Sequence, residues 1–417
     1  MSLPVYAIAA TALLGLVVRP WHSPEVAWAV AGATALVAFG LVPWTGALHA
    51  IGAGTDVYLF LVGMMLLSAM AEREGLFDWL AAVCVGRARG SATRLFTLVY
   101  GVGVIVTVFM SNDATAVVLT PAVLAVCRKA GARPLPYLLA CAMVANAASF
   151  VLPISNPANL VVFADRMPSL AGWLARFALP SLLAVALTYA VLFVLWRRDL
   201  EGAIATDVAV PPLSAPGRLA AAGLGAVALV LLGASALGLA LGAPTLIATA
   251  VVWIAITVAK RESPWSVLGQ VSWSIVPLVA GLFLIVEGLR RAGLLDQLTA
   301  LLHAGAARSM AGAALASGAT VAFAANLTNN LPAGLVAGAV VAAADVDPIV
   351  HSAVAIGIDL GPNLSVTGSL ATLLWLLALR RQGENVSGWT FLKTGAVAMP
   401  LALAAALGAL WLQARLA

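Results

Sequence analysis

The sequence predicts an all-α polytopic membrane protein, with about ten transmembrane helices at roughly 20 residues per crossing. Of the 417 residues, 63% are hydrophobic and only 9% are charged, whereas roughly 25% of the residues of a soluble domain are charged. The mean hydropathy of +1.04 requires most helices to be apolar on every face, and only a bilayer gives every face an apolar neighbour. No polar stretch in the sequence is long enough to form a separate extramembrane domain.

The predicted crossings form two sets on either side of a polar linker. The linker, residues 201–216, contains Asp207, Pro211, Pro212 and Pro216, and such proline-rich polar sequence is typical of a loop outside the bilayer. The first set, in residues 1–200, covers residues 3–19, 25–43, 56–71, 135–163 and 172–196, and the second, in residues 217–417, covers residues 217–240, 244–259, 272–289, 350–379 and 391–414.

Two further stretches, residues 91–130 and 308–345, each consist of two apolar runs that turn at a polar cluster. Polar backbone is tolerated at membrane depth only where protein or a water-filled cavity surrounds it. We therefore expect two re-entrant hairpins, with a pair of plain crossings as the alternative for each. The polar clusters at the tips are Ser111-Asn112-Asp113 and Thr328-Asn329-Asn330.

The two halves of the chain resemble each other. Residues 62–80 align with residues 280–298, so that Gly63 and Gly75 match Gly281 and Gly293, and Asp78 matches Asp296. With a nearly constant offset, the pair Asn112-Asp113 meets the pair Asn329-Asn330. An odd number of crossings in each copy turns the second copy upside down, and inverted repeats with a site near the midplane are typical of secondary transporters.

The basic residues indicate how the chain is oriented. With the N-terminus outside and both hairpins re-entrant, 16 of the 22 Lys and Arg residues lie on the cytoplasmic side, as the positive-inside rule requires. Both termini are then outside the cytoplasm, the linker is cytoplasmic, and the membrane is the cell inner membrane. The net charge of +5 therefore sets the topology and does not indicate binding of nucleic acid.

Proline, glycine and asparagine interrupt one long apolar segment in each half, and this predicts two broken helices, residues 135–163 and 350–380. Broken helices expose backbone N–H and C=O groups, which together with amide and hydroxyl side chains can bind a small polar solute or a cation. The alternative is that these side chains only hold helices together. The candidate substrate-binding residues are Ser111, Asn112, Asp113, Thr115, Asn146, Ser155, Asn156, Asn159, Thr328, Asn329, Asn330, Asn363, Thr367, Gly368 and Ser369.

Two intramembrane carboxylates, Asp113 and Asp359, are the candidates for proton coupling. Charged groups inside a membrane are costly and usually functional, and a carboxyl group that is removed from water binds its proton more firmly. Asp113 has a simpler alternative role as a cap for the hairpin helix. The third membrane carboxylate, Glu287, is expected to form an interfacial ion pair with Arg290 and Arg291.

No cofactor or metal site is predicted. Cys84, Cys127 and Cys141 have no metal-ligand spacing and are interpreted as packing residues, and we expect transport that does not depend on cysteine. The four histidines receive no role. The sequence contains no G-x-x-x-x-G-K-[ST] motif, so this chain is not itself an ATPase.

At the hairpins and breaks the sequence resembles the arsenical pump membrane proteins, the ArsB arsenite efflux family of the ion transporter superfamily. The resemblance covers nearly the whole chain, and one difference is Asn363, where many relatives carry Lys. It implies export of arsenite or antimonite, driven by protons or assisted by a separate cytoplasmic ATPase. The resembling stretches are residues 111–125, 145–160, 326–339, 357–376 and 383–395.

The hypothesis from the sequence is thus a proton-coupled exporter of a neutral trivalent hydroxide. A cage without Lys or Arg suits such a solute, because arsenous acid is uncharged at neutral pH. The main rival is a sodium/proton antiporter or a sodium-coupled anion transporter of the same superfamily. A passive channel and an intramembrane aspartyl protease are more remote, and the G-x-G-D signature of the protease is missing.

Overall fold

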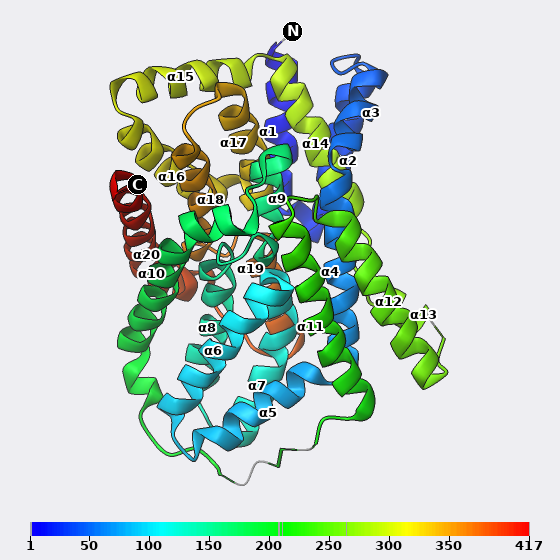
Figure 1. Ribbon diagram of the computed structural model, residues 1–417, viewed down its shortest axis with the longest axis vertical. Coiled ribbons are helices and arrows are strands. Elements are labelled where there is room, and N and C mark those ends of the chain that lie inside the picture. Colours follow the sequence, from blue (N-terminus) through cyan, green and yellow to red (C-terminus); the bar gives the residue numbers. More distant parts are fainter. Residues whose placement is uncertain (1, 207–208, 211, 264, 417) are drawn as a thin grey trace.

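The computed structural model describes residues 2–206, 209–210, 212–263 and 265–416, and this part of the chain is helical and contains no β-strand (Figure 1). Seven of its helices are long and apolar enough to cross a membrane. Every predicted crossing coincides with a helix or, for the two interrupted segments, with a pair of shorter helices. The predicted all-helical membrane fold is therefore confirmed.

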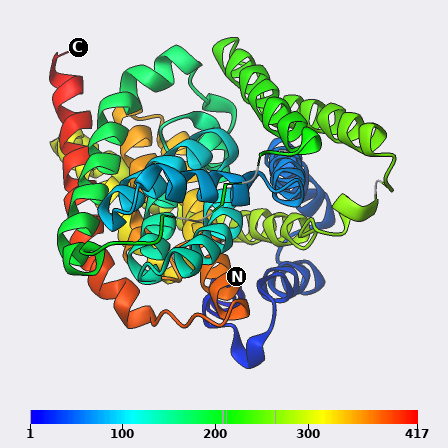
Figure 2. The same cartoon turned by 90° about the horizontal axis from the view of Figure 1, so that it is seen from below.

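One group of helices forms a bundle that we call the scaffold. In it α4 packs against α12 and α2 packs against α14, while α1 and α11 pack on the outside of these pairs. Seen from below, the scaffold occupies the right-hand side of the molecule (Figure 2). Its helices are α1 (Ser2–Val18), α2 (Glu25–Ala38), α3 (Trp44–Ala53), α4 (Thr55–Arg73), α11 (Ala215–Ala236), α12 (Gly242–Lys260), α13 (Trp265–Leu268) and α14 (Ile275–Arg291).

The remaining helices form the hairpin bundle. Its closest partners are α16 with α18, α10 with α20, α6 with α8, and α9 with α17. Its helices are α5 (Leu76–Ala88), α6 (Ala92–Met110), α7 (Thr120–Ala130), α8 (Pro134–Ala147), α9 (Pro157–Phe163), α10 (Leu170–Trp196), α15 (Leu294–Arg308), α16 (Met310–Thr328), α17 (Asn330–Ala344), α18 (Pro348–Leu360), α19 (Leu370–Arg381) and α20 (Gly388–Leu416).

Hairpin 1 consists of α6, a π-helical turn over Ala114–Leu119, and α7, and hairpin 2 consists of α16 and α17. Each begins at a serine whose side chain accepts a hydrogen bond from the first helical turn, Ser91 in α6 and Ser309 in α16. The hairpins approach from opposite ends of the molecule (Figure 1). Two hairpins that enter from opposite ends are the arrangement that an inverted repeat produces.

The helices α5 and α15 were not predicted, because they are too short to span a bilayer. Each begins after a glycine in the left-handed conformation, Gly75 with φ 73° and Gly293 with φ 85°. Each also carries an aspartate in its first turn, Asp78 or Asp296, which suits the positive end of a helix dipole. The residues that match between the two halves of the sequence thus begin equivalent helices.

The linker between the two halves is attached to the base of hairpin 1. The N–H of Ile204 donates to the carbonyl of Gly90 (3.0 Å), and the N–H of Ala205 donates to the carbonyl of Ala130 (2.9 Å). These two acceptors lie at the start and the end of hairpin 1, so the linker joins both of its arms. Residues 207, 208 and 211 of the predicted linker, which include Asp207 and Pro211, lie outside the described residues.

An ion pair ties the base of each hairpin to the outer end of the broken helix from the other half. Arg128, in the last turn of α7, pairs with Glu384 beyond α19 at 2.9 Å. Asp345, at the end of α17, pairs with Arg166 beyond α9 at 2.8 Å. Exposed pairs of this kind contribute about 0–1 kcal/mol each, so they set the position of the hairpins more than the stability of the fold.

Matching glycines bring the scaffold helices into close contact. A Cβ atom on Gly63 of α4 would lie 2.8 Å from a methyl carbon of Thr245 in α12, and one on Gly281 of α14 would lie 2.9 Å from the backbone of Ala29 in α2. Both helix pairs therefore pack at a distance that only glycine allows. Glycine at such contacts is typical of helix packing in membranes.

We predict that Gly63→Leu and Gly281→Leu each destabilise the protein by about 1–3 kcal/mol, because the larger side chain forces the helices apart. Thermal unfolding of the detergent-purified protein measures the effect. Gly225→Leu in α11 is the matched control, since a Cβ atom there meets nothing within 4 Å. Equal melting temperatures for all three variants would contradict the close-packing account.

Candidate substrate site

The two broken helices meet where each of them is interrupted. The amide of Asn146, at the end of α8, donates to the side-chain oxygen of Asn363 at 3.0 Å, and the amide of Asn363 donates to the carbonyl of Met143 at 3.0 Å. The amide of Asn156, just before α9, donates to the carboxylate of Asp359 at 2.6 Å. These side chains are almost completely buried. Polar groups from the two halves therefore satisfy each other inside the bundle.

The hairpin tips are bonded to the same breaks. The backbone N–H of Asn330 donates to the carbonyl of Gly368 at 2.9 Å, which joins hairpin 2 to the second break. The hydroxyl of Ser155 donates to the carbonyl of Val108 at 3.1 Å, which joins hairpin 1 to the first break. Each hairpin thus closes against one break.

The backbone at the two tips has the same unusual conformation. Ser111 has φ 125° and ψ 163°, and Asn329 has φ 75° and ψ 153°. Positive φ is uncommon for residues other than glycine and is concentrated at functional sites. The sequence comparison matches Asn112 with Asn329. The backbone conformation instead matches Ser111 with Asn329, a shift of one residue. Asp113 then corresponds to Leu331, so only one of the two tips carries a carboxylate.

A small cavity of about 10 Å³ lies where the tips and breaks converge. Each half contributes two tip residues, two residues at its break and one scaffold residue, so the lining is nearly symmetric. A space of this size holds about one water molecule. Its lining residues are Asn112, Asp113, Asn156, Pro157 and Leu61, then Asn330, Leu331, Leu370, Ala371 and Ile275.

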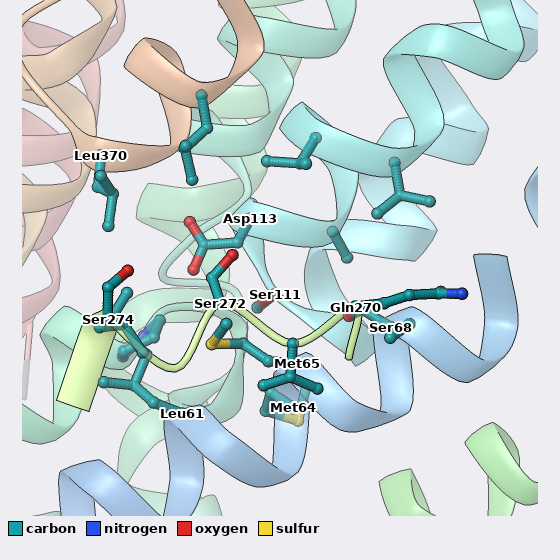
Figure 3. Close-up of a pocket in the computed structure, with 18 of the residues that line it drawn as sticks. Leu61, Met64, Met65, Ser68, Ser111, Asp113, Gln270, Ser272, Ser274 and Leu370 are labelled. Carbon is teal, nitrogen blue, oxygen red and sulfur yellow. The ribbon is translucent and has the colours of Figure 1, made fainter. Parts of the chain in front are cut away.

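A larger cavity of about 190 Å³ extends from this point to the surface and lies between hairpin 1 and the scaffold helices α4 and α14 (Figure 3). Its mouth is formed by exposed residues that include Pro24, Glu72 and Gln270, and its inner end by the buried Ser111 and Ala114. Asp113 lines both cavities. The figure shows its carboxylate in the middle of the pocket, facing Ser272.

The described lining of the larger cavity contains acidic side chains but no Lys or Arg. The carboxylates belong to Glu25, Glu72 and Asp113. Hydroxyl and amide groups come from Ser68, Ser111, Gln270, Ser272 and Ser274, and most other lining residues are aliphatic. This surface favours a neutral or cationic solute and repels an anion.

Several predicted site residues lie near the cavities but bond to the protein instead of lining them. Asn146 and Asn363 form the contact between the breaks, and the hydroxyl of Ser369 bonds to Thr372. The carbonyl of Gly368 accepts from the N–H of Asn330. The other predicted site residues of this group also hydrogen-bond to nearby parts of the protein, and the pairs are Thr115 with Thr107, Ser155 with Val108, Asn159 with Ser149, Thr328 with Ala324, Asn329 with Leu331, and Thr367 with Asn326.

Asp359 is completely buried and lines neither cavity. One of its oxygens accepts from Asn156, and the other has no hydrogen-bond partner within the described chain. An ionised carboxylate with a single donor is poorly compensated in an apolar interior. Asp359 therefore carries an unsatisfied polar atom where α18 meets the first break.

The structure adds site residues that the sequence analysis missed. Asn326 in α16 donates to the carbonyl of Gly361 and accepts from Ser365, so it holds the second break against hairpin 2. Gln270, Ser272 and Ser274 belong to the loop before α14 and line the larger cavity. Ser272 and Ser274 fall at the start of the predicted crossing 272–289, and Gln270 falls just before it, so no signal in the sequence singled these three out.

The residues predicted to stand apart from the site do so. Glu287 pairs with Arg290 at 2.7 Å and with Arg291 at 2.6 Å, which confirms the predicted ion pair. Cys84, Cys127 and Cys141 are free and buried. Within the described residues, no group of three His, Cys, Asp or Glu side chains is placed to hold a metal ion.

We predict that Asn146→Ala lowers the free energy of unfolding by about 1–3 kcal/mol, because it leaves the buried oxygen of Asn363 without its donor. Thermal unfolding of the purified variant measures this loss. Ser235→Ala is the control, since the buried hydroxyl of Ser235 has no partner within the described chain. Comparable melting temperatures for the two variants would show that the contact between the breaks contributes nothing.

The comparisons with known proteins agree with this architecture. Residues 10–379 match the family model CitMHS, described as "Citrate transporter". The chain is 31% identical to an arsenical pump membrane protein of Escherichia coli strain K12 and 30% identical to one of Yersinia enterocolitica, each over 350 residues and 81% of both chains.

Among solved structures, the YdaH transporter of Alcanivorax borkumensis has a similar fold, with a TM-score of 0.60, 17% sequence identity, and coverage of 89% of this chain and 88% of that one. This chain is therefore a membrane transporter and not an enzyme, and it belongs to the CitMHS family together with the arsenical pump membrane proteins.

Proposed function

We propose that this protein is a secondary active transporter that exports arsenite or antimonite, as the neutral trivalent hydroxide, from the cytoplasm in exchange for protons. The names of its relatives suggest two solutes of opposite character, a citrate anion and an arsenical. The character of the cavity lining favours the arsenical.

The observation that carries the proposal is the absence of Lys and Arg from the described lining of both cavities, together with three carboxylates. A multiply charged anion such as citrate would meet Asp113 at the inner end and Glu72 at the mouth without a compensating cation. Arsenous acid is uncharged at neutral pH, and its hydroxyl groups can donate to carboxylates and accept from amides. We therefore favour the arsenical.

In this proposal the substrate binds at the inner end of the larger cavity. Ser111 and Asp113, from the tip of hairpin 1, line the larger cavity, and Asn112, Asn156 and Asn330 line the small cavity that adjoins it. The small cavity holds about one water molecule, so binding at the convergence point requires the tips and breaks to separate. The remaining predicted residues, including Thr115, Asn159, Thr367 and Ser369, would hold the hairpins and breaks in place by their hydrogen bonds.

Asp113 and Asp359 are the proposed proton carriers. Asp113 faces the cavity, where substrate and protons can compete for it. Asp359 contacts Asn156, one of the amides of the small cavity, so a change in its charge alters a proposed substrate contact directly. Competition between a proton and the solute for one site is sufficient to couple their movements in opposite directions.

The cavity mouth indicates which side the site faces. Glu72 is followed by Arg73, and Glu25 pairs with Arg19 at 3.0 Å. The charge distribution assigns these arginines to the cytoplasmic side. We infer that the structure is open to the cytoplasm, that the termini lie outside, and that the two halves are inverted repeats in a cell inner membrane. In this mechanism the proton gradient drives export, and a separate cytoplasmic ATPase subunit would only assist it.

We predict that everted membrane vesicles take up radiolabelled arsenite in the presence of a proton gradient, and that a protonophore abolishes this uptake. Asp113→Asn, Asp359→Asn or both lose the gradient-driven uptake, because a permanently neutral side chain cannot carry a proton. Asp296→Asn is the matched control, since Asp296 is an exposed carboxylate at the start of α15.

Full uptake by both aspartate variants would refute the proton sites and leave the solute assignment standing. Uptake that requires sodium would favour the sodium-coupled members of the superfamily. Flux that continues without a gradient and never concentrates the solute would identify a channel.

We further predict that Glu72→Lys makes citrate or arsenate an inhibitor of arsenite uptake, whereas neither anion inhibits the wild type. The reason is that the variant places a cation at the cavity mouth, beside the path to Asp113. Glu72→Gln is the control for loss of the acidic group alone. Strong inhibition of the wild type by citrate would contradict the proposed solute.

A further inference from the structure

A second large cavity, of about 590 Å³, lies behind hairpin 2 and is separate from the proposed transport site. It is bounded by α15, α16 and α17 and, on the scaffold side, by Leu13 of α1 and Leu289 of α14. None of its lining residues belongs to the small cavity or to the 190 Å³ cavity. We call it the hairpin 2 cavity.

The described lining of the hairpin 2 cavity is almost entirely aliphatic and contains no charged side chain. Its polar side chains are the hydroxyls of Ser317, Thr320 and Thr328, and that of Thr328 already donates to the carbonyl of Ala324 in its own helix. Water is not stable in an apolar cavity that offers so few partners. The occupant must therefore be apolar.

The helix α15 indicates the depth at which this cavity lies in the membrane. Leu294, Leu298 and Leu302 repeat every four residues and face the cavity, whereas Asp296 and His303 are exposed and do not line it. The helix runs across the end of hairpin 2 (Figure 1). A short amphipathic helix in this position lies in the membrane interface, so the space beneath it is at the level of the acyl chains.

The cavity is continuous with an apolar outer surface. On α16, Phe323 is 53% exposed and Leu327 is 72% exposed, and each is next to a lining residue, Ala324 or Thr328. On α15, the lining residue Leu301 is itself 69% exposed. In a membrane this surface contacts lipid, so an acyl chain can enter the cavity sideways without crossing a polar barrier. The exposed Arg308 ends α15 three residues after the lining residue Gly305, and a basic side chain near the membrane surface can attract a phosphate group.

We propose that the hairpin 2 cavity binds one acyl chain of a membrane phospholipid. Thr328 and Pro332 line the cavity and flank the tip residues Asn329 and Asn330, so the bound chain extends to the tip of hairpin 2. The chain separates hairpin 2 from Leu13 and Leu289 of the scaffold. It therefore forms part of the interface between hairpin 2 and the scaffold.

The test is photolabelling of the full-length protein in vesicles of phosphatidylethanolamine and phosphatidylglycerol that carry a diazirine in the acyl chain. Mass spectrometry of the digested protein locates the labelled residues. We expect labels on lining residues of α15 and α17, and loss of these labels in Ala337→Trp and in Ala316→Trp, which fill the cavity from α17 and from α16.

Two controls accompany the filling variants. Leu327→Trp places the same side chain on the exposed face of α16, outside the cavity, and should keep the wild-type labels. Labels on the exposed residues Ile247 and Ile254 of α12 report general contact with lipid and should not change in any variant. Size-exclusion chromatography and thermal unfolding show whether each variant is folded.

Wild-type protein with labels on α12 but none in the cavity would overturn the proposal. Cavity labels that persist in both folded filling variants would overturn it equally, because they would come from the outer surface. If one filling variant fails to fold, the other decides the result. Transport activity does not enter the readout, so the outcome is independent of the solute.

Discussion

The structure depends on one constraint: inside a bilayer, backbone polar groups that a helix leaves free must find partners in the protein or in a water-filled cavity. Two helices are interrupted in mid-membrane, and the polar groups at each break bond both to the other break and to the hairpin of their own half. Asn146 bonds to Asn363, and Asn156 bonds to Asp359, across more than 200 residues of sequence. The hairpin tips complete this arrangement by bonding to the same breaks. The polar centre therefore joins four segments, the two breaks and the two hairpins.

Much of the fold follows from local sequence. Apolar runs of sufficient length predict the crossings, and Pro153, Asn156 and Gly361 interrupt such runs where the helices are in fact broken. What the sequence could not provide was the partner of each polar residue. Thr115 and Asn156 appear equally suitable as site residues, yet Thr115 bonds within hairpin 1 while Asn156 lines the small cavity. A local sequence pattern does not show which distant segments come into contact.

The departures from symmetry are as informative as the symmetry itself. The two tips share a backbone conformation, but Asp113 at one tip corresponds to Leu331 at the other. Asp359 lies in α18, just before the second break. Each half therefore supplies one of the two candidate proton-coupling carboxylates, Asp113 from a hairpin and Asp359 from a broken helix. A duplicated framework can in this way keep its geometry while its two copies take on different chemical roles.

The pairing of the two breaks also has a consequence for biosynthesis. Ribosomes deliver the first half of a chain before the second, and segments generally begin to fold as they emerge. When Asn146 and Asn156 enter the membrane, Asn363 and Asp359 have not yet been translated. Until they arrive, the amides of the first break require temporary partners, supplied by water or by the insertion machinery. The first break can therefore complete its hydrogen bonds only after the second half has entered the membrane.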